Sequence, residues 1–405
     1  MNLQDFRFLL SPAGEKWLAE LTQAEISPQT HLVWASRLRQ VVEPSQAHAL
    51  LETALLRRRA AAKFSRADSM FFTREALEQA SAEVVAQYRA ARYADAGFTV
   101  VLDLCCGIGG DAAALAAAAH VIGIEQDALR LAMAAQNVAV YGYSAHFQPR
   151  QTDARALSPT LLAGRERIQP QAIFFDPARR DAHGKRLYRL DEYEPPVSEV
   201  LRTWQRHVPH IGVKIGPGVD YAEIPEEAEV EFISVAGEVR EGVLWFGNLR
   251  SGAARRATLL PAGHTLTTLD ESESTPLSSP QTYLYEPDGA VIRAHLVTTL
   301  AQQLRASLID PDIAYLTAFH YLSTPFARAF RLEAVFPFQL KRLRHYLRQQ
   351  DVGQVTIKKR GSPLDPDQLR QQLRLQGNRH LHIFLTHVMG EPTVLLGKPV
   401  ANGDS

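Results

Sequence analysis

The chain contains little cysteine, and the cysteine it has is adjacent in sequence. Cys105 and Cys106 are the only two cysteines among 405 residues. Neighbouring cysteines rarely form a disulfide, and two thiols without distant partner cysteines do not make a zinc site. The sequence therefore predicts neither a disulfide framework nor a bound metal, and we expect a reducing compartment, the cytoplasm.

Long apolar runs and a net charge are also missing. No stretch approaches the ~20 consecutive apolar residues that a membrane-spanning helix needs. Residues 1–17 lack the basic segment and apolar core of a signal peptide, so we expect neither a leader nor a membrane partner. Lys and Arg together number 44, as do Asp and Glu, so the formal net charge is zero. The chain as a whole has no basic field that would attract a polyanion.

The length and the residue patterns predict several domains. A chain of 405 residues exceeds the usual size of a single domain. Residues 1–95 are rich in Ala, Leu, Glu, Gln and Arg with apolar residues three or four apart, which predicts a helical region in which Thr73 caps a helix that begins near Arg74. Residues 96–260 alternate apolar strands with helices, which predicts a parallel, doubly wound α/β sheet that ends in an antiparallel hairpin.

The last third of the chain divides in two. Residues 261–325 are predicted as a linker and helical connection, because "DESESTPLSSPQ" (270–281) is polar and rich in Ser and Pro. Residues 326–400 alternate shorter strands and helices and predict a small α/β domain.

A glycine-rich turn follows the first strand of the predicted sheet. In "VLDLCCGIGGD" (101–111), Gly107 and Gly109 with Ala112 fit the pattern of a dinucleotide site, and Glu125 after the next strand could bind ribose hydroxyls. Asp103 lies four residues before Gly107, and its carboxylate would repel a pyrophosphate but attract an ammonium or a sulfonium. The turn therefore favours S-adenosylmethionine over NAD.

With the segments that follow, the chain resembles the class I S-adenosylmethionine-dependent methyltransferases. "VLDLCCGIGGD", "VIGIEQD", "TDA" and "FFDPARR" match their four motifs in order, and "AQNVAVYG" is similar to a helix end in the trimethylguanosine synthase group. "RRRAAAKF", "LEQAS" and "IKKRG" make nearly the whole chain similar to bacterial methyltransferases with a THUMP-like C-terminal domain. The resemblance implies a Rossmann-like sheet and S-adenosylmethionine as the cofactor.

The resemblance also implies which residues bind the cofactor. They lie at the ends of the first three strands or in the turns after them: Asp103, Cys105, Gly107, Gly109, Glu125, Gln126 and Asp153. The first strand's turn would line the methionine end of the cofactor. Glu125 would accept from the ribose hydroxyls, Gln126 would flank the adenine, and Asp153 would accept from the adenine amino group.

The fourth motif predicts the catalytic residues. Asp176 and Pro177 follow a strand at the carboxyl end of the sheet, as in enzymes that hold the exocyclic amino group of a base at Asp/Asn-Pro-Pro-aromatic. Arg179 stands where those enzymes have the aromatic residue, so the stacking platform is missing there, and Arg179 could stack on a base or pair with a phosphate. Lys214 in "VKIGPG" ends the next strand close to the same site, where it would bind a substrate phosphate or only border the site.

The C-terminal module is basic although the chain is neutral. Between Phe326 and Arg379, twelve Lys and Arg stand against four Asp and Glu. Lys358, Lys359 and Arg360 are candidate phosphate contacts, although a basic helix face can also be merely solvated. A second basic cluster lies in the N-terminal helices: Arg57, Arg58, Arg59, Lys63 and Arg66.

These observations lead to one main hypothesis and two alternatives. The main hypothesis is a methyltransferase that modifies a nitrogen of an RNA base, guanine N2 or adenine N6, in rRNA or tRNA. Carbon-5 methylation of a pyrimidine is disfavoured because it needs a cysteine nucleophile at the substrate site. The alternatives are an RNA-binding or assembly protein that binds the cofactor without turnover, and a methyltransferase that acts on a protein or a small molecule.

Overall fold

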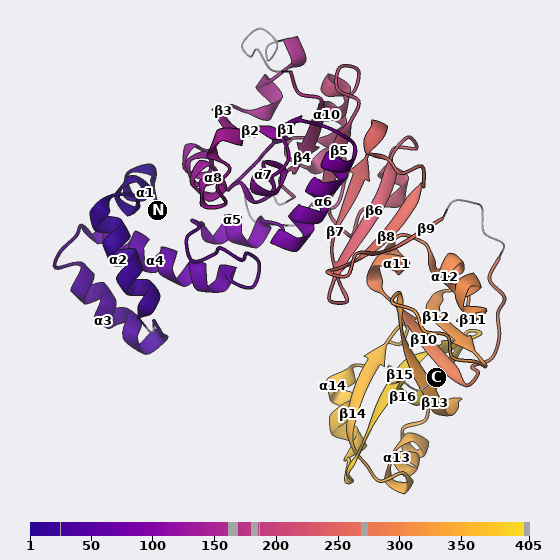
Figure 1. Cartoon of the computed structure of the whole chain (residues 1–405). Helices are drawn as coiled ribbons and strands as arrows, with labels where there is room; N and C mark the ends of the chain where they lie inside the picture. Colours follow the sequence, from indigo (N-terminus) through magenta and orange to yellow (C-terminus); the bar gives the residue numbers. More distant parts are fainter. Residues whose placement is uncertain (25, 161–168, 180–184, 186, 269–273, 401–405) are drawn as a thin grey trace. The chain divides into compact units, whose positions relative to one another are not determined.

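The structure, a computed structural model, describes residues 1–24, 26–160, 169–179, 185, 187–268 and 274–400 (Figure 1). The chain forms two compact units. The first consists of Met1–Glu229 with Glu241–Ser251, and the second of Val230–Arg240 with Gly252–Ser405. Within the described residues, no helix has the length and apolar character to cross a membrane.

The N-terminal region is helical, as predicted. Its helices are α1 (Leu3–Leu9), α2 (Pro12–Gln23), α3 (Pro28–Leu38), α4 (Pro44–Ala60), α5 (Arg74–Gln79) and α6 (Glu83–Asp95). Side chains of Asn2, Ser11, Ser27 and Thr73 cap four of these helices, since a side-chain oxygen there satisfies a free backbone N–H. The sequence between Arg74 and Tyr93 forms two helices rather than one, because the backbone is extended at Ala80 and Ala82.

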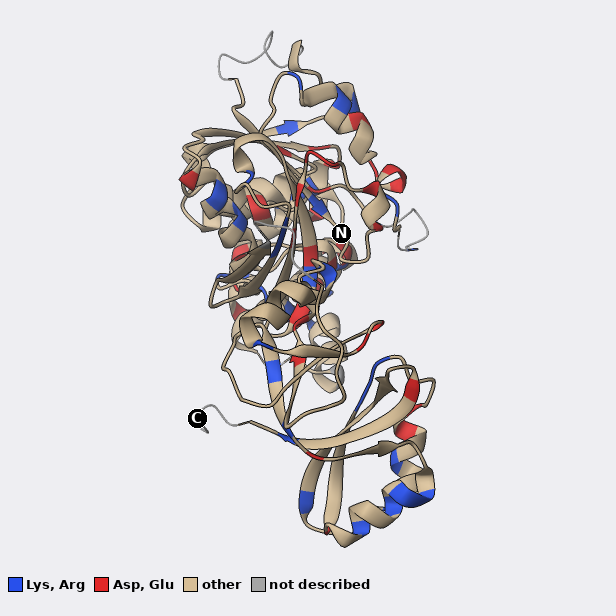
Figure 2. Ribbon diagram, turned by 90° about the vertical axis from the view of Figure 1, so that its right-hand side faces the viewer, with Lys and Arg blue, Asp and Glu red and all other residues tan. Residues whose placement is uncertain are grey.

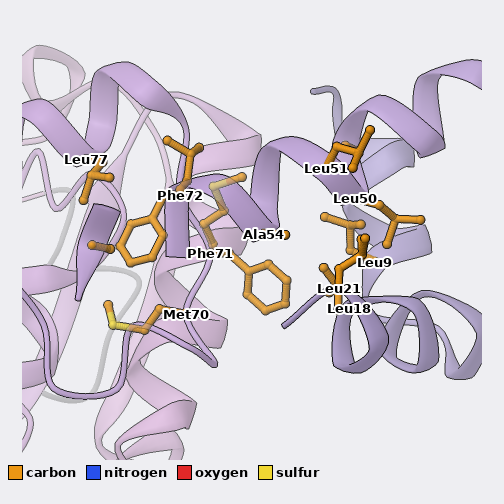
Figure 3. Close-up of a cluster of buried hydrophobic side chains, with 14 of the residues drawn as sticks. Leu9, Leu18, Leu21, Leu50, Leu51, Ala54, Met70, Phe71, Phe72 and Leu77 are labelled. Carbon is orange, nitrogen blue, oxygen red and sulfur yellow. The ribbon is translucent and has the colours of Figure 1, made fainter. Parts of the chain in front are cut away.

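Buried side chains join these helices to the sheet of the same unit. Leucines of α1, α2 and α4 pack with Met70, Phe71 and Phe72, which lie between α4 and α5 (Figure 3). The same cluster includes Ile108 from the glycine turn and Met133 from α8 (Ala128–Val140). The helical region therefore shares its core with the turn where the cofactor is expected.

Most cations between Arg57 and Arg66, at and after the end of α4, contact other residues of this region. Arg57 donates to the carbonyls of Ser69 and Met70, and its guanidinium lies over the Phe71 ring. The remaining ties run to backbone carbonyls: Arg58 donates to Ala24 and Ile26, Lys63 to Leu77, Glu78 and Ala80, and Arg66 to Val140. Four of the five cations in the cluster are thus engaged within the protein.

The first sheet has the order β3-β2-β1-β4-β5-β7-β6-β8-β9. Its strands are β1 (Val100–Leu104), β2 (His120–Glu125), β3 (Phe147–Gln151), β4 (Ala172–Phe175), β5 (Ile211–Ile215), β6 (Glu229–Val235), β7 (Glu238–Trp245), β8 (Arg255–Leu260) and β9 (His264–Thr268). Strands β1 to β5 are parallel, and β7 runs antiparallel to β5. Helices α7 (Gly110–Leu115), α8 and α10 (Val197–Trp204) alternate with them, which confirms the doubly wound fold.

The sequence predicted that the sheet ends at the hairpin of β6 and β7. The structure shows that it continues beyond this hairpin. Strand β8 pairs parallel to β6, and β9 pairs antiparallel to β8. Strand β8 lies within residues 96–260, which the sequence assigned to the doubly wound sheet, whereas β9 lies within residues 261–325, which it assigned to a linker.

The second unit contains a seven-stranded sheet of order β11-β12-β10-β13-β16-β15-β14. Its strands are β10 (Tyr283–Pro287), β11 (Ser307–Asp310), β12 (Ile313–Ala318), β13 (Ala327–Pro337), β14 (Val352–Lys359), β15 (Arg379–Val388) and β16 (Glu391–Pro399). Its helices are α11 (Gly289–Arg293), α12 (Val297–Leu304), α13 (Leu340–Gln349) and α14 (Pro366–Leu373). The short strands and helices predicted after residue 326 are present as β13, α13, β14, α14, β15 and β16. Strands β10 to β12 come from the predicted connection, and residues 269–273 within it lie outside the described part of the chain.

Asn137 of α8 should be a main anchor between the helical region and the sheet. Its side chain is fully buried, accepts from the Phe71 N–H at 2.8 Å, and donates to the carbonyls of Phe71 and Ile108 at 2.9 and 2.8 Å. Asn137→Ala would leave three buried backbone groups unpaired, so we expect the free energy of unfolding to fall by about 2–4 kcal/mol in urea titrations. The exposed Asn248→Ala is the control and should change it by less than about 0.5 kcal/mol. Equal stabilities of the two variants would contradict the anchoring role.

Candidate active site

The turn between β1 and α7 is built on left-handed backbone. Cys105, Gly107 and Gly109 have φ angles of 64°, 54° and 79°. A side chain at Gly109 is excluded for a second reason, because a Cβ there would lie 2.9 Å from the Cα of Ala134 in α8. Glycine at 109 thus lets α8 pack directly against the turn. Cys105 is a non-glycine residue in a conformation that glycine adopts more easily.

Asp103 is a buried carboxylate without a hydrogen-bonding partner. Its side chain is 0% exposed, and neither oxygen has a partner among the residues that the structure describes. Burial, and then the negative charges of Asp111 and Asp176, raise the pKa of Asp103 well above its usual value. Such a group is completed by a ligand that brings hydrogen-bond donors and positive charge. The ammonium of an amino acid moiety has both properties, so Asp103 fits the methionine end of the expected cofactor.

Glu125 is fixed at the end of β2 by two backbone amides. Gly107 donates to its Oε2 at 3.1 Å and Asp127 to its Oε1 at 3.0 Å. The carboxylate is thereby oriented beside the glycine turn, and its other lone pairs suit two adjacent hydroxyl groups. This geometry fits the predicted ribose contact.

The two residues expected at the adenine are less constrained. Gln126 is exposed directly after Glu125. Asp153 accepts from the backbone and guanidinium of Arg155, and the hydrogen bond from Arg155 is the largest cause of its lowered pKa. Gln126 follows β2 and Asp153 follows β3, and these two strands pair with each other. At their ends, the side chain of Gln151 donates to the Gln126 carbonyl.

Asp176 and Lys214 form an ion pair at the carboxyl ends of β4 and β5. Lys214 Nζ lies 2.7 Å from Asp176 Oδ2, and a second, longer contact of 3.4 Å joins Nζ to the Gln79 carbonyl. The Lys214 side chain is 2% exposed and that of Asp176 is 23% exposed. A buried ammonium needs a partner, and Asp176 provides it. Lys214 is therefore not open to a substrate phosphate, which corrects the sequence-based expectation that it contacts substrate directly.

The segment after β4 folds back across the end of β5. Ala178, after Pro177, forms a β-bridge with Glu194, and Arg179 Nη1 donates to the Ile215 carbonyl at 3.3 Å. Gly216 N donates to the buried hydroxyl of Tyr193 at 3.1 Å. Arg179 is therefore held against the strand end, and Arg180 lies outside the described residues.

Sequence reasoning missed Arg89, a second buried cation beside Lys214 in this unit. Its guanidinium pairs with Asp111 of α7 and Glu241 of β7, donates to Ser81, and lies over the Phe174 ring. Burial works against the charge, but the carboxylates Asp111, Glu241 and Asp176 outweigh it, so the pKa of Arg89 is raised. Its partners lie 22 and 152 residues away along the chain, a separation that no local motif signals.

The predicted basic footprint in the second unit is only partly exposed. Lys358 pairs with Glu286 and lies over the Phe330 ring, and Arg360 donates to the Ala314 carbonyl and lies over the Tyr315 ring. Lys359 is exposed. Figure 2 shows further Lys and Arg along the helices of this unit. The exposed ones on α13, on α14 and at its C-terminal end are Lys341, Arg342, Arg348, Arg370 and Arg374.

Three family models match the chain. Residues 98–179 match "RNA cap guanine-N2 methyltransferase" and residues 327–399 match "THUMP domain-like". Residues 2–60 match a domain of unknown function.

A curated relative and a solved structure each cover most of the chain. The chain is 36% identical over 350 residues to an uncharacterised S-adenosylmethionine-dependent methyltransferase of Mycobacterium tuberculosis, a match that spans 84% of this chain and 92% of the relative. A protein of Porphyromonas gingivalis W83 that has been assigned as a methyltransferase has a crystal structure with a TM-score of 0.76 and 22% identity over 96% of this chain and 99% of its own. That likeness shows the fold alone.

The raised pKa of Asp103 gives a pH dependence to the stability of the ligand-free protein. The folded state holds the Asp103 proton more tightly than the unfolded chain, so the contribution is fully present below about pH 3.9, the usual pKa of Asp, and is lost as the pH rises toward the raised value. Asp103→Asn removes this loss. We therefore expect the variant to gain stability over the wild type progressively above about pH 4 in urea unfolding.

Asp153→Asn is the control for this measurement. The pKa of Asp153 is lowered, so its contribution is present above the usual Asp pKa and is lost as the pH falls. The two variants should therefore depart from the wild type in opposite directions near neutral pH. If the free energy of unfolding changes with pH in the same way in Asp103→Asn and in the wild type, the pKa of Asp103 is not raised in the folded protein.

Proposed function

The chain belongs to the S-adenosylmethionine-dependent methyltransferases, and from this premise we propose that it methylates a nitrogen of an RNA base. Identity of 36% across 84% of the chain establishes the enzyme class and the cofactor. The cofactor supplies a methyl group bound to a positively charged sulfur. The proposal concerns what the residues of this chain do with that group.

The cofactor is proposed to lie along the carboxyl ends of β1, β2 and β3. Asp103 and the backbone of Cys105, Gly107 and Gly109 would hold the amino acid end, where the unpaired carboxylate is the main support. Glu125 would hold the ribose. Gln126 and Asp153 would lie beside the adenine, in line with their positions after β2 and β3.

The ion pair of Asp176 and Lys214 is the observation that carries the proposal. Strand β4 pairs with β1, so Asp176 follows the strand next to the one that bears Asp103. Lys214 donates to Oδ2 of Asp176, which leaves Oδ1 as the carboxylate oxygen that this ion pair does not use. An exocyclic amino group could donate to Oδ1, which would aim its lone pair toward the methyl group and give the departing proton an acceptor.

The thiols support nitrogen rather than carbon as the target. Burial raises the pKa of both Cys105 and Cys106, so neither is a ready thiolate at neutral pH. Both also lie in the glycine turn. Attack on carbon 6 of a pyrimidine needs a thiolate at the substrate, which these positions do not offer.

Two observations support RNA as the substrate. Residues 98–179 match the guanine-N2 family and residues 327–399 the THUMP-like domain. Helix α13 also presents exposed cations, as phosphate contact requires. We therefore place guanine N2 first and adenine N6 second. Retention of Asp176 with a buried counter-charge speaks against a cofactor-binding protein without turnover.

The test is methyl transfer to RNA from a strain that lacks the gene. The purified protein is incubated with this RNA and S-adenosylmethionine carrying a labelled methyl group, and the nucleosides are separated by mass spectrometry. Labelled N2-methylguanosine or N6-methyladenosine supports the proposal and identifies the atom. If the label appears only in protein or in small molecules, RNA is not the substrate. If it appears on a carbon atom of a pyrimidine, nitrogen is not the methylated atom.

Asp176→Asn should retain cofactor binding and lose turnover. The amide keeps the size of the side chain but is a poor proton acceptor and lacks the charge that pairs with Lys214. We expect the rate on RNA to fall by about 100-fold or more, with S-adenosylmethionine affinity by calorimetry nearly unchanged. Asp95→Asn, an exposed Asp at the end of α6, should behave as the wild type. An unaltered rate in Asp176→Asn would remove Asp176 from the reaction.

Exposed cations of the second unit should set the salt dependence of RNA binding. We expect the combined change Lys341→Gln, Arg348→Gln and Lys359→Gln to weaken binding. The slope of log affinity against log salt should fall by about 0.7–0.9 for each phosphate that the variant no longer neutralises. The control removes the same charge from exposed N-terminal helix positions: Arg7→Gln, Lys16→Gln and Arg39→Gln. Identical slopes in both triple variants would show that the C-terminal cations are merely solvated.

A further inference from the structure

The fourth motif lacks the aromatic residue on which a base would stack, yet an aromatic ring is exposed nearby. Tyr188 is 58% exposed. Among the described Phe, Tyr and Trp residues of the first unit, it is the one with an exposed side chain. The other rings in the unit are buried or partly buried, as expected for side chains that stabilise by leaving water. Exposure of one large ring calls for an explanation.

The Tyr188 ring lies beside the segment that holds the catalytic ion pair. Its Cδ1 and Cε1 atoms are 3.6 Å from the position that a Cβ on Gly218 would occupy. Gly218 follows β5 by three residues, and Lys214 of β5 carries the contact with Asp176. The backbone between Lys214 and Gly218 also receives Arg179, at the Ile215 carbonyl. One short segment thus links Tyr188, Arg179 and Asp176.

Arg179 is less suited to replace the missing aromatic residue. Its guanidinium donates to the Ile215 carbonyl and lies 3.8 Å from the position of a Gly216 Cβ, so it is held against the strand end. The Tyr188 ring approaches Gly218 with its Cδ1 and Cε1 atoms, while the residue as a whole is 58% exposed. An open aromatic face offers stacking to any base, because every base has a planar π-face.

We propose that Tyr188 is the platform on which the base to be methylated stacks. The inference rests on the proposed function and deepens it. An aromatic plane near an acceptor carboxylate matches a nucleobase, which has both a flat face and an exocyclic amino group. A protein or aliphatic amine would use Asp176 but gain little from the ring. Tyr188 is a substrate-binding residue, and its face rather than its hydroxyl does the binding.

The test compares Tyr188→Ala and Tyr188→Phe in methyl transfer to RNA from a strain that lacks the gene. Loss of one stacked base should raise the KM for RNA in Tyr188→Ala by about 5- to 150-fold, with a smaller change in kcat. Tyr188→Phe keeps the ring face and should stay within about twofold of the wild type. Affinity for S-adenosylmethionine by calorimetry should be the same in all three proteins. Phe319→Ala, which removes a ring that is 67% exposed in the second unit, is the matched control.

The outcomes separate this inference from the proposed function. If the wild type does not methylate RNA, the proposed function fails and the role of Tyr188 fails with it. If the wild type is active and Tyr188→Ala has the same KM, the function stands and the platform is refuted. If Tyr188→Phe is as impaired as Tyr188→Ala, the hydroxyl rather than the ring face binds substrate, which also refutes stacking. A raised KM that phenylalanine restores supports the platform.

Discussion

The balance of buried charge at the carboxyl ends of the central strands is the constraint on which this enzyme depends. Asp103, Asp111 and Asp176 lie close enough for the charges of the other two to raise the pKa of Asp103. Two buried cations offset them. Arg89 pairs with Asp111, and Lys214 pairs with Asp176. Asp103 remains without a hydrogen-bonding partner among the described residues, which supports the proposal that the ammonium of the cofactor binds there.

The two buried cations have different chemistry and serve different purposes. The Arg89 guanidinium can satisfy several acceptors at once, and it connects Ser81, Asp111 of α7 and Glu241 of β7. It thereby ties the helix before the sheet to the glycine turn. Lys214 is a single point of charge that reaches one carboxylate oxygen, which leaves the other oxygen of Asp176 with a distinct environment. Arg89 therefore connects helices and strands of the unit, whereas Lys214 orients the Asp176 carboxylate that is proposed to act on the substrate.

Local patterns in the sequence were enough to predict the parallel part of the first sheet, but not its continuation into β8 and β9. Alternating apolar strands and helices predicted that β1 to β5 are parallel and doubly wound, and the spacing of Gly107 and Gly109 predicted the turn after β1. What local patterns could not supply were contacts between distant segments. Arg89 meets Glu241 across 152 residues, and the pairing of Lys214 with Asp176 forms only when β4 and β5 lie side by side. Strands β10 to β12 were missed because they are short and separated by helices and polar loops.

The exposure of Lys358, Lys359 and Arg360, at the end of β14, follows from the alternation of side chains along a strand, which the sequence alone could have indicated. Side chains alternate between the two faces of a strand, so three neighbours cannot all point the same way. Lys358 lies over Phe330 and Arg360 over Tyr315, rings that belong to one core cluster of the sheet. Lys359 is exposed between them. A run of basic residues in a strand therefore contributes about half its charge to any one surface. On a helix such as α13, residues three and four apart share a face, so its cations can act together on a phosphate backbone.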